Sequence, residues 1–312
     1  MLLSRVADAL YWMTRYLERA EHTARLVDVA VDLRLGRSSD AATQVYGLVL
    51  PAGVLPTSVS LTEVAFFDGA NPNSVTACVV AARENARQVR DEISSEMWEQ
   101  LNALFLRLRQ MRDDPARASR TNDAARAVIE GAHLFAGVTD ATMGHGEGWH
   151  YLQAGRFLER AVATARLLDA VFSDESGPVP MPPLDRADWV ALLRSCAALE
   201  GYCRQYTADV RPERVTEFLL LNAECPRSIR FAATRVEGAL TALARYSGRA
   251  IGARAERLAG RLRAVLDYAQ VDEVLGEGPH AYLSELARQC AQIHGALYQS
   301  YVSYAVESAL PA

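Results

Sequence analysis

Apolar residues recur along the start of the chain at the spacing of an α-helix, with steps of four and three residues in alternation. They stand at Val6, Leu10, Met13, Leu17, Ala20, Ala24, Val27 and Val31. Because an α-helix has 3.6 residues per turn, this spacing places them in one stripe on one face. The pattern predicts a long helix from Ser4 to about Leu35, which Gly36 ends.

The same spacing predicts further helices along the rest of the chain, and no segment shows the alternation of a half-buried strand. The stretches 37–60 and 173–183 carry no such period and are predicted to be irregular. The expected fold class is all-α, a helical bundle without a β-sheet. The further helices are expected near 61–68, 73–92, 95–112, 122–137, 148–173, 186–207, 212–222, 226–247, 251–270 and 280–304.

Two segments of the chain are similar to each other at a constant offset of 141 residues. RYLERAEHTARLVDV at 15–29 and RFLERAVATARLLDA at 156–170 share ten of fifteen residues. A weaker pair is DGANPNS at 68–74 and NAECPRS at 222–228, each a polar loop before a long helix. This order predicts one domain, 1–312, built from two diverged, pseudo-symmetric helical repeats, at about 1–142 and 143–312.

Charged side chains stand opposite the apolar stripe of the first repeated helix and return in the second. Glu21 and His22 become Val162 and Ala163 in the second copy, whereas the other charges stay. Charged groups on an otherwise apolar helix need partners, since burial of an unpaired ion is unfavourable. The candidate polar site therefore comprises Arg15, Glu18, Arg19 and Arg25 with Arg156, Glu159, Arg160 and Arg166.

Two interpretations of this polar site remain open from the residues. The side chains form ion pairs within and between helices that orient the two units. Alternatively, they line a shared pocket or a partner surface, where paired Arg would suit a carboxylate or phosphate and Glu would suit an amine.

Sequence motifs for metal or nucleotide binding are weak. Glu18 and His22 stand one turn apart, but the second copy has Ala163 in place of the histidine. The loop at 143–149 is glycine-rich but fits no phosphate-binding pattern. We therefore expect no metal and no cofactor. The E-x-x-H spacing of di-iron bundles occurs at Glu130/His133, Glu147/His150 and Glu277/His280. We interpret these as short spacings of common residues rather than as metal ligands.

Charge and hydropathy narrow the choice of partner and compartment. The formal charge of −5, from 33 basic and 38 acidic side chains, argues against nucleic acid as the main partner. The longest apolar stretches are shorter than the ~18 residues that a membrane span needs, and the start lacks the features of a secretion signal. The five cysteines form no C-x-x-C pair, which favours reduced structural thiols. We expect a cytoplasmic protein.

Three motifs resemble those of the bacterial alpha-E family. They are MLLSRVADALYWMTRYLERAEHTARLVDV at the start, GEGWHYLQAGRFLERA in the middle and FLLLNAECPRSIRF further on, in the family's order and across essentially the whole chain. The resemblance implies an all-α protein whose gene accompanies that of a circularly permuted ATP-grasp protein and often that of a transglutaminase-like cysteine protease.

The resemblance also implies site residues. The family's signature Glu and Arg match Arg15, Glu18, Arg19, Arg156, Glu159 and Arg160, and its Pro-x-Ser turn matches Pro226 and Ser228. Paired Arg near this turn suggests an anion-binding turn of Arg227, Ser228 and Arg230. The first half has Asn73 in place of Arg227, so this site is not expected on both sides.

Three functional hypotheses follow. The first is an accessory helical protein in an ATP-grasp-linked amide-bond-forming or peptide-modifying system, which binds the amidoligase or its substrate. The second is an independent enzyme in which Glu18 and Glu159 act as acid and base in a pocket between the repeats. The third is a homo-oligomeric scaffold. A catalytic carboxylate should lie in a cleft and have a raised pKa, whereas a structural one should be held by arginine.

Overall fold

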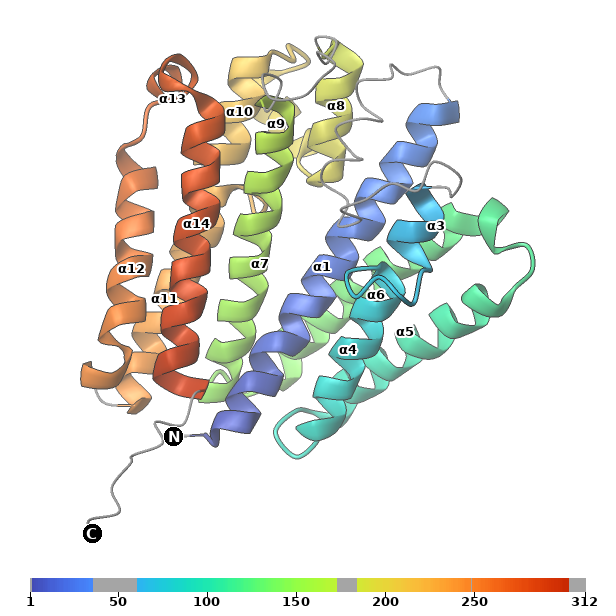
Figure 1. The fold of residues 1–312 in the computed structure, drawn as a ribbon, viewed down its shortest axis with the longest axis vertical. Coiled ribbons are helices and arrows are strands. Elements are labelled where there is room, and N and C mark those ends of the chain that lie inside the picture. Colours follow the sequence, from blue (N-terminus) through green and yellow to red (C-terminus); the bar gives the residue numbers. More distant parts are fainter. Residues whose placement is uncertain (1, 36–60, 173–183, 248, 303–312) are drawn as a thin grey trace.

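A computed structural model describes residues 2–35, 61–172, 184–247 and 249–302, and within these ranges every regular element is helical (Figure 1). The predicted all-α fold is confirmed. The helices are α1 (Ser4–Leu35), α3 (Leu61–Phe66), α4 (Val75–Gln88), α5 (Ser95–Asp113), η1 (Arg117–Arg120), α6 (Thr121–Thr142), α7 (Glu147–Phe172), α8 (Arg186–Ser195), α9 (Leu199–Tyr206), α10 (Pro212–Leu221), α11 (Ile229–Ser247), α12 (Arg249–Tyr268), α13 (Val271–Glu277), α14 (Pro279–Leu297) and η2 (Tyr298–Val302).

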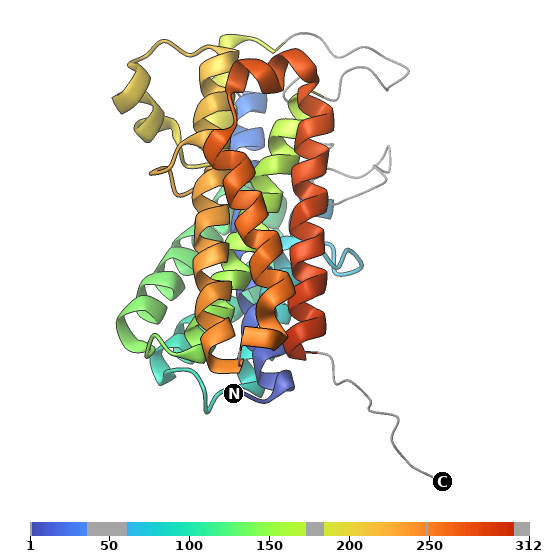
Figure 2. The same cartoon turned by 90° about the vertical axis from the view of Figure 1, so that its left-hand side faces the viewer.

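The two helices that carry the repeated sequence, α1 and α7, pack against each other in the middle of the molecule. Helix α1 also contacts α4 and α6, and α5 packs on those two helices. Helix α7 contacts α11 and α14 in the same way, and α12 packs on both (Figure 2). Each half is thus a four-helix unit with the same order of contacts, while common descent of the two units stays a prediction.

Helices α1 and α7 come closest at a glycine. A Cβ atom on Gly155 would lie 2.2 Å from the backbone oxygen of Tyr11 and 2.7 Å from Oγ1 of Thr14. The Thr14 hydroxyl donates a hydrogen bond across the same interface to the Leu152 carbonyl, at 2.8 Å. Only glycine leaves room for this approach, which brings the polar side chains of the two helices within reach of each other.

Serine side chains cap the starts of two helices. Ser74 accepts a hydrogen bond from the Ala77 amide before α4, and Ser94 accepts one from Met97 before α5. Such caps satisfy amide groups that have no partner within the helix. The apolar stripe of α1 is buried as predicted from Val6 to Val27. None of the described helices combines the length and apolar character needed to cross a membrane.

Two helix predictions were wrong in detail. The segment expected as one helix at 186–207 is broken into α8 and α9, because Ala197 adopts a positive φ of 47° that an α-helix does not accommodate. The short helix α13 was missed, and the helix expected at 280–304 ends its α-helical part at Leu297 before a π-helical turn. The predicted irregular stretches, 37–60 and 173–183, lie outside the described residues.

Candidate functional site

The Glu159 carboxylate of α7 is held by two arginines of α1. Arg15 Nε lies 2.7 Å from Oε2, and Arg19 Nε lies 2.6 Å from Oε1. Arg19 also donates to the Asn73 side chain at 2.7 Å, and Arg15 donates to the Tyr11 hydroxyl at 3.2 Å. The carboxylate therefore ties α1 to α7, and Arg19 adds the turn before α4.

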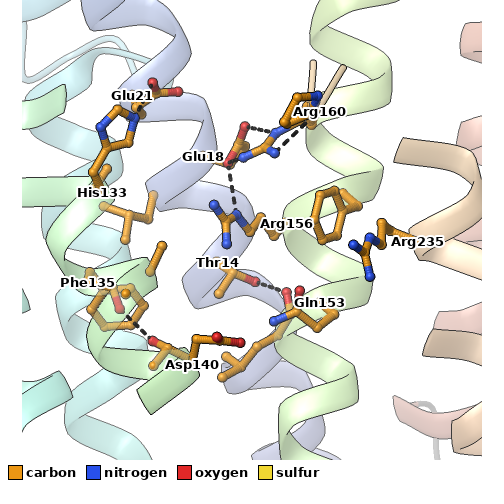
Figure 3. A pocket seen from close by; sticks show the side chains of 18 of the residues that line it. Thr14, Glu18, Glu21, His133, Phe135, Asp140, Gln153, Arg156, Arg160 and Arg235 are labelled. Atoms are coloured by element: carbon orange, nitrogen blue, oxygen red, sulfur yellow. Dashed lines mark hydrogen bonds and ion pairs between the residues drawn. The ribbon is translucent and has the colours of Figure 1, made fainter. Parts of the chain in front are cut away.

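The Glu18 carboxylate of α1 is held in the reciprocal way by α7. Arg160 places Nε 2.6 Å from Oε1 and Nη2 2.8 Å from Oε2. Arg227, from the turn before α11, adds Nη1 at 3.0 Å from Oε1. Arg156 stands further away, with Nε 3.6 Å from Oε2. The structure thus brings the six signature residues and Arg227 together, with each glutamate paired with arginines of the other helix. Figure 3 shows the Glu18 side of this network, with Arg156 and Arg160.

Burial and charge act in opposite directions on these carboxyl groups. Burial alone would raise the pKa of Glu18, but the charges of Arg160 and Arg227 lower it to about 2. Burial likewise opposes ionisation of Glu159, and Arg15 and Arg19 lower its pKa below the ordinary value. Both glutamates are therefore ionised at neutral pH and serve as fixed negative charges.

Glu21 and His22 join the cluster although the sequence comparison gave them no role. Glu21 pairs with Arg227, and its Oε1 lies 2.5 Å from Arg25 Nη2. Burial and then the charge of Arg227 lower the pKa of His22 to about 4, so its ring is neutral at neutral pH. The one signal for Glu21 in the sequence was its i,i+4 spacing to Arg25.

The remaining predicted residues lie apart from this cluster. Arg166 is exposed and pairs with no acidic side chain among the described residues. Its equivalent in the first copy, Arg25, pairs with Glu21, but the second copy has Val162 at the position of Glu21. In the predicted anion-binding turn, the Ser228 hydroxyl donates to the Asn222 carbonyl. Arg230 Nε donates to Asp267 Oδ1 at 2.9 Å. The three side chains of the turn thus face different internal partners rather than one open position.

The histidines with E-x-x-H spacing have other contacts. His133 Nε2 lies 3.6 Å from Glu21 Oε1, whereas Glu130 is 3.7 Å from Arg107. His280 Nδ1 lies 2.6 Å from Asp169 Oδ1. Across the described residues, no group of three His, Cys, Asp or Glu side chains is placed to hold a metal ion.

A cavity of about 540 Å³ opens on the Glu18 side of the α1–α7 pair. Helix α6 forms its opposite wall, and the start of α7, the turn before α11 and Arg235 close it (Figure 3). Sequence reasoning identified only Glu18, Arg156, Arg160 and Arg227 of its lining. The other polar and aromatic lining residues are Thr14, Glu21, His133, Phe135, Thr139, Asp140, Trp149, Gln153, Phe157 and Arg235.

Fold and site together define an all-helical protein whose two central helices are joined by reciprocal, buried Glu–Arg pairs. The chain belongs to the Alpha-E family, described as a predicted alpha-helical domain with a conserved ER motif, which matches residues 2–302. Two E-R dipeptides of this chain, Glu18-Arg19 and Glu159-Arg160, lie in the network.

Similar proteins are longer than this chain. It is 28% identical to an uncharacterized protein of Mycobacterium bovis and 27% identical to one of Mycobacterium tuberculosis, in each case over 98% of this chain. The chain spans 37% of the length of these relatives. No solved structure matches it significantly.

Proposed function

We propose that this protein is an accessory helical protein rather than an enzyme, and that it binds a circularly permuted ATP-grasp amidoligase, or that enzyme's substrate, in an amide-bond-forming or peptide-modifying system. The observation that carries the proposal is the state of the two signature glutamates. Each is buried, ionised and held by arginines, so it serves to fix α1 against α7 rather than to exchange a proton. The role belongs in the cytoplasm, where ATP is available to the partner.

The alternative, acid–base catalysis by Glu18 and Glu159, fits this geometry less well. A general acid or base at neutral pH needs a pKa near the working pH, but arginines shift both carboxyl groups in the opposite direction. Glu18 borders the cavity, yet Arg160 occupies both of its oxygens. Protonating it would leave Arg160 and Arg227 without a counter-charge, which is costly in a buried site.

The length of the mycobacterial relatives supports an accessory role. In them, the region similar to this chain is accompanied by a longer stretch of other sequence, since it makes up 37% of the whole. A domain that is joined to further sequence in its relatives commonly works together with that sequence. We therefore expect the region described here to work together with a partner.

The test is co-purification of this chain with the circularly permuted ATP-grasp protein from the same genome, followed by ATP-turnover assays with and without the chain. A stable complex with altered turnover is the expected result. A chain with Arg166→Gln, an exposed change away from the cavity, serves as the matched control and should behave as the wild type.

Absence of a complex together with unchanged turnover would overturn the proposal in favour of an independent enzyme or a scaffold. Light scattering on the chain alone then separates these two, because a homo-oligomeric scaffold has a multiple of the chain mass. The same pull-down repeated with the transglutaminase-like protein tests the second partner that the family resemblance implies.

A further inference from the structure

Arg15 and Arg156 stand at equivalent positions of the repeated segment but in different electrostatic states. Nε and Nη2 of Arg15 both lie 2.7 Å from Glu159. Burial alone would lower the pKa of Arg15, but the Glu159 carboxylate raises it above the ordinary value. Arg156 Nε is 3.6 Å from Glu18, and burial and then the charge of Arg160 lower the pKa of Arg156. Arg156 therefore has an incompletely compensated charge.

The residues that cover these two arginines also differ. Trp12 packs over Arg15, with the guanidinium carbon 4.9 Å from the ring centre, and His294 packs edge-on against Trp12. The equivalent of Trp12 in the second copy is Gln153. Gln153 lines the cavity beside Arg156 (Figure 3). The smaller, polar side chain leaves Arg156 facing open space where Trp12 covers Arg15.

The charge of the cavity wall is not balanced within the described residues. Four arginines line the cavity, Arg156, Arg160, Arg227 and Arg235, and three carboxylates do so, Glu18, Glu21 and Asp140. Glu18 and Glu21 are already held by Arg160 and Arg227. The arginines of the wall therefore outnumber its carboxylates by one.

The remaining wall includes Trp149 and an apolar surface. The Trp149 indole Nε1 is buried and has no hydrogen-bond partner among the described residues. A buried polar group without a partner is uncommon in folded proteins. Leu17, Ala132, Phe135 and Phe157 supply apolar surface to the same cavity.

We propose that this cavity binds an organic carboxylate with a single negative charge and an apolar body, with Arg156 and Arg235 facing the carboxylate and Gln153 beside them. Arginine N–H groups match a carboxylate in geometry, and one negative charge balances the wall. The apolar body packs against Phe157 and Phe135. This inference deepens the proposed function, since such a carboxylate is the kind of group that an amide-forming partner activates.

The test is isothermal titration calorimetry of the full chain with 3-phenylpropionate. Neutral 3-phenylpropanol and dianionic phenyl phosphate serve as comparison ligands. We expect the carboxylate to bind and the alcohol and the phosphate to bind at least about tenfold more weakly. Trp149 fluorescence, compared with that of a Trp149→Phe chain, reports whether the ligand enters this cavity.

Variants locate the site. Arg156→Gln should weaken binding of 3-phenylpropionate about tenfold or more, because it removes a charged donor. Gln153→Trp, which copies Trp12, should abolish binding by filling the space. Arg235→Gln is a second test that does not alter the buried network, and Arg166→Gln on the same helix as Arg156 is the matched control. Circular dichroism confirms that each variant is folded.

Three results would overturn the inference: no binding of 3-phenylpropionate to the wild-type chain, binding unchanged by both Arg235→Gln and Gln153→Trp, or tighter binding of phenyl phosphate. These results are independent of the pull-down. Carboxylate binding without an ATP-grasp complex would reject the proposed function alone, whereas a productive complex without carboxylate binding would reject this inference alone.

Discussion

Arg15 of α1 and Glu159 of α7 form a buried ion pair between the two central helices, with Nε and Oε2 2.7 Å apart. Glu159→Gln would leave the buried Arg15 and the partly buried Arg19 without their carboxylate. Removal of one partner of a buried ion pair costs about 3–5 kcal/mol. We therefore expect Glu159→Gln to lower the free energy of unfolding by about that amount, as measured by urea denaturation.

The control for this experiment is Glu285→Gln, which changes a partner of the exposed Glu285–Arg288 pair. Exposed pairs contribute little, so this variant should unfold close to the wild type. A Glu159→Gln chain of unchanged stability that had lost its effect on the ATP-grasp partner would instead support a catalytic role for this glutamate.

The all-helical fold could be predicted from the sequence, and so could the need of the signature charges for partners. The stripe from Val6 to Val27 identified the buried face of α1. The charges repeated at Arg15, Glu18 and Arg19 needed partners, but which elements supply them became visible only in the packed structure. The period of apolar residues and the position of charges on a helix face are properties of a single segment, so both can be read from the order of its residues.

The cavity could not be predicted in the same way. It depends on Asp140, Trp149 and Arg235, which come from three separate helices and share no spacing. The cavity is open because the second copy has Gln153 at the position that corresponds to Trp12. That this substitution leaves space beside Arg156 is visible only when α1 and α7 are packed together. Likewise, the break at Ala197 arises from one backbone angle that no residue preference signals.

His22 should make the protein less stable at mildly acidic pH. Its pKa is about 4 in the folded chain, because of burial and then Arg227, against 6.5 ordinarily. Between pH 6.5 and 4 the unfolded chain therefore binds a proton that the folded chain does not, and stability falls as the pH falls. The difference corresponds to about 3 kcal/mol at most. Urea denaturation at a series of pH values measures it.

The variant His22→Ala, which copies Ala163 of the second repeat, should flatten this part of the pH profile. A second fall should remain below about pH 4.5, because the pKa of Glu18 is lowered to about 2 from 4.5. That carboxylate stabilises the folded chain above its unfolded pKa, and the stabilisation is lost as the pH falls towards 2. An unchanged slope between pH 6.5 and 4 in the variant would reject His22 as the source.

Gly155→Ala should force α1 and α7 apart. The added Cβ would lie 2.2 Å from the Tyr11 carbonyl oxygen, a backbone atom that cannot move aside alone. Overpacking of this kind costs about 1–3 kcal/mol or more, and thermal unfolding followed by circular dichroism measures it. Gly238→Ala in α11 has no neighbour within 4 Å, so the better helix former should leave stability equal or raise it. Equal melting temperatures for the two variants would contradict the close approach.

Arg227 bridges two carboxylates, since it pairs with both Glu18 and Glu21. Arg227→Gln should destabilise the chain by about 3–5 kcal/mol, because among the described residues the buried Glu21 then keeps Arg25 and His133 as its neighbours of opposite or potentially opposite charge. When Glu21→Gln is added to Arg227→Gln, no buried carboxylate is left at position 21 that requires the charge of Arg227. The double variant should therefore be more stable than the sum of the two single changes predicts, by about 1 kcal/mol or more. Additive effects in this double-mutant cycle would mean that the two side chains do not depend on each other.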